Sequence, residues 1–170
     1  EIPLSSYSSL IFAVAAVIVF SVCAFAAENT QRLFILNAAD GSSASEAAEY
    51  AAKNGFSGIA LDCRNGYSDG FTAQLSEASG ELRLYAICHG DVAEKLSASN
   101  FETVLIPADE ASAEILSVLG ERAGVLLPFG NESAAENAEK LYSDGCFKTL
   151  FAEIPLSSYS SLIFAVAAVI

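Results

Sequence analysis

Polar and charged side chains follow directly on several short apolar runs of the chain. Asp62 and Arg64 come after one such run, His89 after the next, and Glu153 after the last. Two carboxyl groups in different surroundings can act as general acid and general base, because one donates a proton while the other stays ionised. We therefore predict that Asp62 and Glu153 form a catalytic pair, each directly following a buried strand.

Three neighbouring side chains are predicted to position a ligand, namely Asn37, Arg64 and His89. Purely structural roles for these residues remain as alternatives. Asp62 can form an ion pair with Arg64 or with Arg83, and the only histidine, His89, can be a packed or capping residue. The spacing of Cys and His residues does not fit a closed zinc site, and no glycine-rich nucleotide loop is present, so we expect neither a metal nor a cofactor.

The elements that must position these residues alternate along the chain. Six apolar runs of four to six residues end in polar, Gly or Pro residues, which is typical of parallel strands covered on both faces. These runs are Leu33–Leu36, Gly58–Leu61, Leu82–Ile87, Thr103–Ile106, Gly124–Leu127 and Thr149–Ala152.

Helix signals lie between most of the runs. Ser43 with Glu46 forms a capping box, Asp109 and Asn131 are candidate N-caps, and Gly55 follows the first predicted helix. The strands and helices predict an α/β fold. Even spacing favours a partial, TIM-barrel-like array of about six βα units over a doubly wound sheet. Six units do not close an eight-stranded barrel.

The pattern resembles a secreted bacterial (β/α)-barrel of the glycoside-hydrolase-like kind. The likeness rests on the apolar segment Leu10–Ala27, the unit SEAAEYAAKNGFSGIALDCRNG (Ser45–Gly66) and GCFKTLFAEIP (Gly145–Pro155). It implies a polysaccharide substrate, with Asp62 and Glu153 as the carboxylates. The alternatives are a non-catalytic barrel that binds a glycan or another partner, and a fragment without autonomous function.

An apolar segment precedes the predicted barrel. Leu10–Ala27 contains no charged residue and, as a helix, would be about 27 Å long. A secretory signal, a membrane anchor and a buried helix are the competing interpretations. We expect residues 1–27 to be a signal-like or anchor segment, residues 28–161 to form an incomplete barrel domain, and the protein to be extracellular or anchored through contact with a membrane.

The sequence also repeats itself without a change. Residues 1–18, EIPLSSYSSLIFAVAAVI, recur as residues 153–170. Structural repeats normally drift in sequence and end at the border of a unit, whereas this copy ends inside an apolar run. Together with the absence of Met, this favours a boundary artefact over a tandem array.

Composition excludes some classes of partner. The 170 residues include 8 Lys and Arg against 21 Asp and Glu, giving a net charge of −13. Phosphate contacts need clustered cations, so we expect no nucleic acid and no polybasic attachment to lipid. A hydrophobic content of 53% is too high for a disordered chain.

Overall fold

A computed structural model describes residues 31–37, 43–96, 99–128, 131–155 and 163–168 of the chain. The chain divides into two units, Glu1–Thr30 and Gln31–Ile170. The first lies outside the described residues, and with it the predicted apolar helix. None of the helices within the described ranges is long and apolar enough to cross a membrane.

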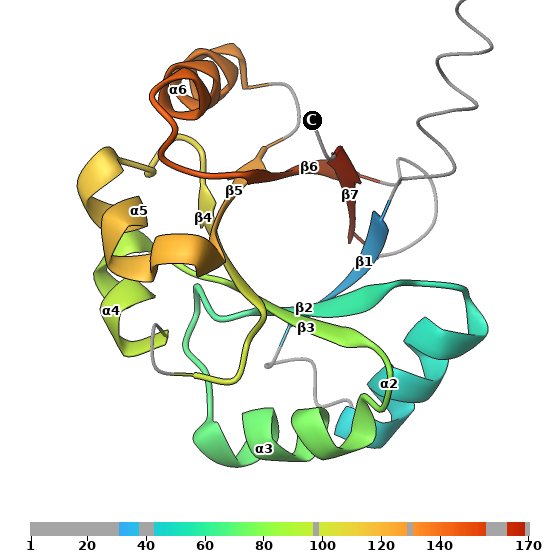
Figure 1. Cartoon of the computed structure of the whole chain (residues 1–170). Coiled ribbons are helices and arrows are strands. Elements are labelled where there is room, and N and C mark those ends of the chain that lie inside the picture. Colours follow the sequence, from blue (N-terminus) through green and yellow to red (C-terminus); the bar gives the residue numbers. More distant parts are fainter. Residues whose placement is uncertain (1–30, 38–42, 97–98, 129–130, 156–162, 169–170) are drawn as a thin grey trace, which may run out of the picture. The chain divides into compact units, whose positions relative to one another are not determined.

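Six parallel strands form the sheet, and they confirm the six predicted runs. The sheet order follows the chain order, and each strand is parallel to the next. Figure 1 shows the strands arranged around a central axis that points toward the viewer, with the helices on the outside of the ring. The parallel strands are β1 (Gln31–Asn37), β2 (Gly58–Asp62), β3 (Arg83–Ile87), β4 (Thr103–Pro107), β5 (Ala123–Leu127) and β6 (Thr149–Pro155).

Helical segments connect consecutive strands, as the alternating pattern predicted. They are α2 (Ala44–Lys53), α3 (Asp69–Ala78), the short η1 (Gly90–Val92) with α4 (Ala93–Leu96), α5 (Ala113–Leu119) with η2 (Gly120–Arg122), and α6 (Glu132–Ser143).

The helix caps show how local sequence sets these boundaries. The Ser43 hydroxyl accepts from the Glu46 N–H and the Glu46 carboxylate accepts from the Ser43 N–H, which confirms the capping box. Asn131 caps α6 as predicted. Asp109 as the cap of α5 was wrong, because the helix begins later and Ser112 accepts the capping bond from Ile115.

A seventh strand, β7 (Ile163–Ala168), was not predicted from the sequence. It runs antiparallel to β6 on one side and to β1 on the other, so the seven strands close into a barrel. In Figure 1 it lies between β6 and β1. Its residues belong to the second copy of the repeated 18-residue segment.

Alternate residues of the strands fill two separate cores. Inside the ring, the Tyr85 and Phe151 rings meet edge to face with centroids 5.4 Å apart, and the Tyr85 hydroxyl donates to the Gln31 side chain. The intervening positions face the helices and form the larger core. The buried members of the inner core are Leu33, Ala60, Tyr85, Ile87, Leu105, Leu126 and Phe151.

Gly58 makes room for the inner core. A Cβ on this residue would lie 2.5 Å from the Arg83 carbonyl oxygen and 2.9 Å from a ring carbon of Tyr85. The first contact is with backbone, which cannot rotate away. The small residue at the start of β2 therefore allows the large ring on β3 to point inward.

We predict that Gly58→Ala lowers the free energy of unfolding by about 1–3 kcal/mol or more, because the inner core and the β3 backbone must shift. Urea denaturation measures the change. Gly70→Ala is the matched control, since its Cβ would meet nothing closer than Ser68 Oγ at 3.7 Å. It should leave the stability unchanged or raise it by up to about 1 kcal/mol. Equal losses in both variants would contradict this account of Gly58.

Candidate functional site

Strand alternation directs the predicted site residues toward the carboxyl end of the barrel interior. Asp62 lies two residues beyond the inner-core residue of β2, and Glu153 lies two beyond that of β6. Asn37 and His89 have the same relation to inner residues of β1 and β3. Since side chains two apart share a face of a strand, the four residues belong to one mouth of the barrel.

Asp62 and Arg64 form the most extensive polar contact at this mouth. Arg64 donates through Nη2 to Asp62 Oδ2 at 2.7 Å, through Nε to Oδ1 at 2.9 Å, and through its backbone N–H to Oδ1 at 3.1 Å. The Asp62 side chain is 11% exposed and that of Arg64 27%. The chain turns at this point, where the Gly66 N–H donates to the Cys63 carbonyl. The ion-pair interpretation of Asp62 is therefore confirmed.

The pair sets the ionisation of Asp62. Burial raises the pKa of this carboxyl, but the hydrogen bonds and charge of Arg64, with a smaller contribution from His89, outweigh burial and hold the pKa below its ordinary value. Asp62 is therefore an anion at neutral pH. It is suited to act as a base, a nucleophile or a stabiliser of positive charge, but not as a proton donor.

Arg64 also lies in the electric field of two further carboxylates. Its hydrogen bonds to Asp62 raise the pKa of the guanidinium, burial opposes this, and the charges of Asp62, Glu153 and Glu110 raise it further. Glu153 is half-buried on the same mouth. The structure thus brings Asp62, Arg64 and Glu153 into electrostatic reach of one another, as expected for residues on one strand-end face.

His89 pairs with a residue that sequence reasoning missed. Its Nδ1 lies 2.8 Å from both carboxylate oxygens of Glu110. An ionised carboxylate can only accept a hydrogen bond, so Nδ1 carries the hydrogen and donates it to Glu110. The other ring nitrogen, Nε2, then faces a ligand or solvent. Glu110 follows β4 in a turn in which its N–H donates to the Pro107 carbonyl. Its position just after an apolar run was the available signal, but the candidate N-cap at Asp109 implied that Glu110 begins a helix.

Asn37 is placed beside this group by strand register. It ends β1, and its Cα partner on β2 is Asp62. The side chain is half-buried. Among the described residues, no group of three or more His, Cys, Asp and Glu side chains is arranged to hold a metal ion.

The two cysteines near the mouth belong to the outer core and not to the site. Cys63 and Cys88 are free, buried thiols that pack between the sheet and the helices. Burial, reinforced by the charge of Asp62, raises the pKa of Cys63 to about 12. Burial also raises the pKa of Cys88 to about 12, with smaller contributions from neighbouring groups that include Cys63. A thiol in this state is a poor nucleophile.

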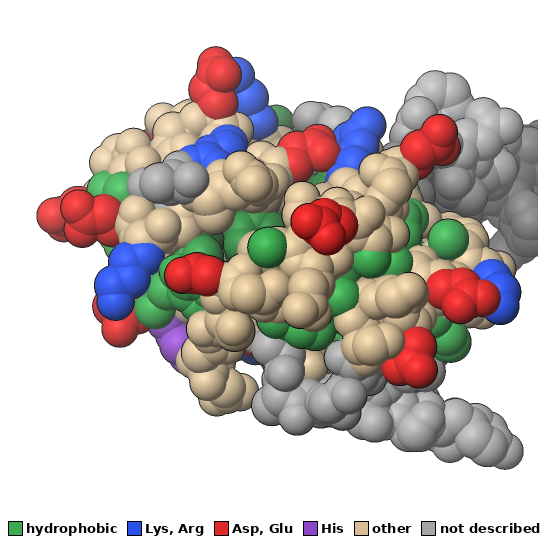
Figure 2. Space-filling model, turned by 90° about the horizontal axis from the view of Figure 1, so that it is seen from below, with side chains coloured by type: hydrophobic (Ala, Val, Ile, Leu, Met, Phe, Trp, Pro, Cys, Tyr) green, Lys and Arg blue, Asp and Glu red, His purple; other side chains and the backbone are tan. Residues whose placement is uncertain are grey.

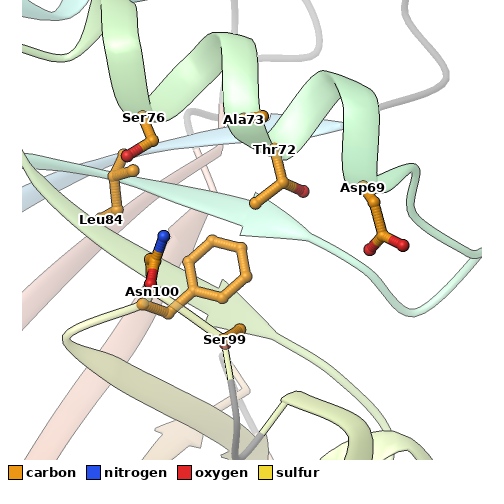
Figure 3. Close-up of a pocket in the computed structure, with 8 residues that line it drawn as sticks. Asp69, Thr72, Ala73, Ser76, Leu84, Ser99 and Asn100 are labelled. Carbon is orange, nitrogen blue, oxygen red and sulfur yellow. The ribbon is translucent and has the colours of Figure 1, made fainter.

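A separate hollow lies on the outer wall, between α3 and the segment that leads into β4 (Figure 3). Its volume is about 210 Å³. Thr72 and Asp69 come from the helix, and Asn100 faces them from the opposite side. Its lining does not include any residue of the barrel mouth. The residues that line it are Asp69, Thr72, Ala73, Ser76, Leu84, Ser99, Asn100 and Phe101.

No protein-family model, curated protein or solved structure matches the chain. A functional assignment therefore depends on the charged residues at the mouth and on their geometry.

We predict that Asp62→Asn lowers the free energy of unfolding by about 2 kcal/mol at pH 7, because it leaves a largely buried guanidinium without its anion. The hydrogen bonds and charge of Arg64 hold the folded-state pKa of Asp62 below its ordinary value. The stabilisation is therefore complete above the unfolded-state pKa and is lost as the pH falls through the folded-state pKa. Denaturation curves from pH 7 to pH 2 measure the difference between the wild type and the variant.

The difference should shrink toward zero at the acid end. Asp109→Asn, which alters an exposed carboxyl, is the control and should track the wild type throughout. A difference between Asp62→Asn and wild type that stays constant down to pH 2 would contradict the ionic role of Asp62.

We predict that Cys63 and Cys88 resist alkylation in the folded protein at pH 8, while the partly exposed Cys146 reacts. A pKa of about 12 lowers the thiolate fraction about 10³-fold relative to an ordinary thiol. Mass spectrometry of the Cys23→Ser variant, which removes the cysteine outside the described residues, gives the rate at each site. Equal labelling of all three cysteines without denaturant would show that the two thiols are not buried.

Proposed function

We propose that this protein is a glycoside-hydrolase-like barrel that acts on a polysaccharide at the carboxyl end of its strands. The observation that carries the proposal is the Asp62–Arg64 pair, which keeps one carboxylate ionised on the same mouth as a second, Glu153. Glycoside hydrolysis requires two carboxyl groups with different roles.

The two roles follow from the surroundings of each group. Glu153 does not take part in the two-point contact with Arg64 and acts as the proton donor to the glycosidic oxygen. Asp62, held as an anion, stabilises the positive charge that develops on the sugar ring as the bond to the leaving oxygen breaks. Water then adds its hydroxyl to the anomeric carbon, and the proton that it releases passes to the Glu153 carboxylate, which restores the acid.

The remaining polar groups bind and orient the sugar. Arg64 keeps hydrogen-bonding capacity beyond its two contacts with Asp62, and Asn37 lies beside that pair by strand register. Glu110 holds the imidazole of His89 by Nδ1, which directs the other ring nitrogen toward a ligand hydroxyl. Glu110 is thus a positioning residue in this proposal.

One observation favours a second candidate function, a non-catalytic barrel that binds a glycan. Arg64 engages both carboxylate oxygens of Asp62, and a carboxylate whose charge is already paired stabilises positive charge on a sugar ring less strongly. Either function suits an extracellular or membrane-anchored protein whose segment Leu10–Ala27 is a signal or anchor, and this localisation is part of the proposal.

We predict that Asp62→Asn and Glu153→Gln each lower the rate of hydrolysis by about 10²–10⁴-fold on any glycan that the wild type cleaves. The assay measures reducing ends released from a panel of neutral polysaccharides, with Asp109→Asn as the matched control at an exposed carboxyl. Wild-type and variant proteins that all give the same trace rate would exclude catalysis by this pair. Retention of the wild type on an insoluble glycan without turnover would instead support the binding function.

A further inference from the structure

The two buried cysteines stand at adjacent ends of β2 and β3. The last register pair of these strands joins Asp62 to Ile87, and Cys63 and Cys88 are the next residue along each strand. The ladder continues past that pair, because the Cys63 N–H donates to the Ile87 carbonyl at 2.8 Å. The Cα atoms of the two cysteines are therefore about 4.8 Å apart, the spacing of neighbouring strands. Disulfides join residues whose Cα atoms lie about 4.4–6.8 Å apart.

Both side chains lie on the same side of the sheet. Cys63 and Cys88 are buried in the outer core, between the strands and the helices. Each reaches the other electrostatically, since the charge of Cys63 contributes to the raised pKa of Cys88. In the reduced chain, the Cys63 thiol donates to the Leu61 carbonyl at 3.6 Å. A rotation that turns this sulfur toward Cys88 gives up that weak bond.

We propose that Cys63 and Cys88 form a stabilising disulfide when the chain folds in an oxidising medium. The oxidant is a small disulfide such as glutathione disulfide. One cysteine thiolate attacks it and releases a first thiolate, and the other cysteine then displaces the second. The two cysteine protons pass to the released thiolates, so the small disulfide is reduced to two thiols. The bond forms while β2 and β3 come together, because the core shields both sulfurs afterwards.

The disulfide links the two strand ends that carry the mouth of the barrel. Cys63 lies between Asp62 and Arg64, and Cys88 directly precedes His89. The bond closes a loop of about 25 residues, which restricts the unfolded chain and so stabilises the folded one. It also fixes the turn of the Asp62–Arg64 pair against the turn that begins at His89.

The test uses the full-length chain with Cys23→Ser and Cys146→Ser, which leaves Cys63 and Cys88 as its two cysteines. The chain is reduced in urea and refolds in a buffer of glutathione and glutathione disulfide. Peptide mass spectrometry without reductant then measures the yield of the Cys63–Cys88 bond, which we expect to form in most molecules.

The matched control carries Cys23→Ser and Cys88→Ser and keeps Cys63 with Cys146. Cys146 precedes β6 and Cys63 follows β2, so these residues lie at opposite ends of the parallel sheet. We expect at least tenfold less intramolecular disulfide in this control. Equal yields in the two variants, or thiols that stay free in both, overturn the proposal.

Thermal unfolding measures whether the bond stabilises the chain. The oxidised form of the first variant should unfold about 5–10 °C above its reduced form. A chain that also carries Cys63→Ser should unfold at the same temperature in both buffers. Dithiothreitol should reduce the bond at least tenfold more slowly in native buffer than in urea. An oxidised form that unfolds at or below the temperature of the reduced form, or equal reduction rates, overturns the proposal.

Discussion

Six parallel strands leave two edges whose N–H and C=O groups need partners, and one segment, β7, pairs with both edges. A parallel sheet of this size can remain open only if its edges are covered or shielded by charge. Here the antiparallel strand converts the curled sheet into a ring of seven. The enclosed inner core and the single mouth at the carboxyl ends both depend on that closure.

A ring of seven strands has a narrow interior, and its filling dictates residue size along each strand. Tyr85 has room there because its two neighbours on β2 are small, namely its register partner Ala60 and the nearby Gly58. Two positions further along, the same inward-facing rows become polar at Asp62 and Glu153. The same alternation that points every second side chain into the core therefore also points the charged groups toward the barrel mouth. The surface is acidic as well, and Figure 2 shows Asp and Glu side chains spread over one face.

The fold was largely predictable from the sequence because its signals are local. Apolar runs such as Gly58–Leu61 and caps such as Ser43 act over a few residues, and the structure has them where the pattern placed them. The strand β7 was not predictable in this way, since a segment of small and apolar residues has no preferred partner until two open edges exist. The candidate site was likewise predictable only where its contacts are local in the sequence. The contact between Asp62 and Arg64 spans two residues, whereas that between His89 and Glu110 spans twenty-one and joins two different loops.

The charges at the mouth also narrow the chemistry of the proposed ligand. The charges of Asp62, Glu110 and Glu153 all act on the guanidinium of Arg64, so three carboxylates outnumber the one arginine at this mouth. An anionic sugar such as a uronate or a sugar phosphate would meet this excess in a partly desolvated place, where like charges repel strongly. A neutral glycan does not meet this repulsion. Its hydroxyls can donate to the carboxylates and accept from Arg64, so the same arrangement that keeps Asp62 ionised selects for uncharged polysaccharide in the proposed function.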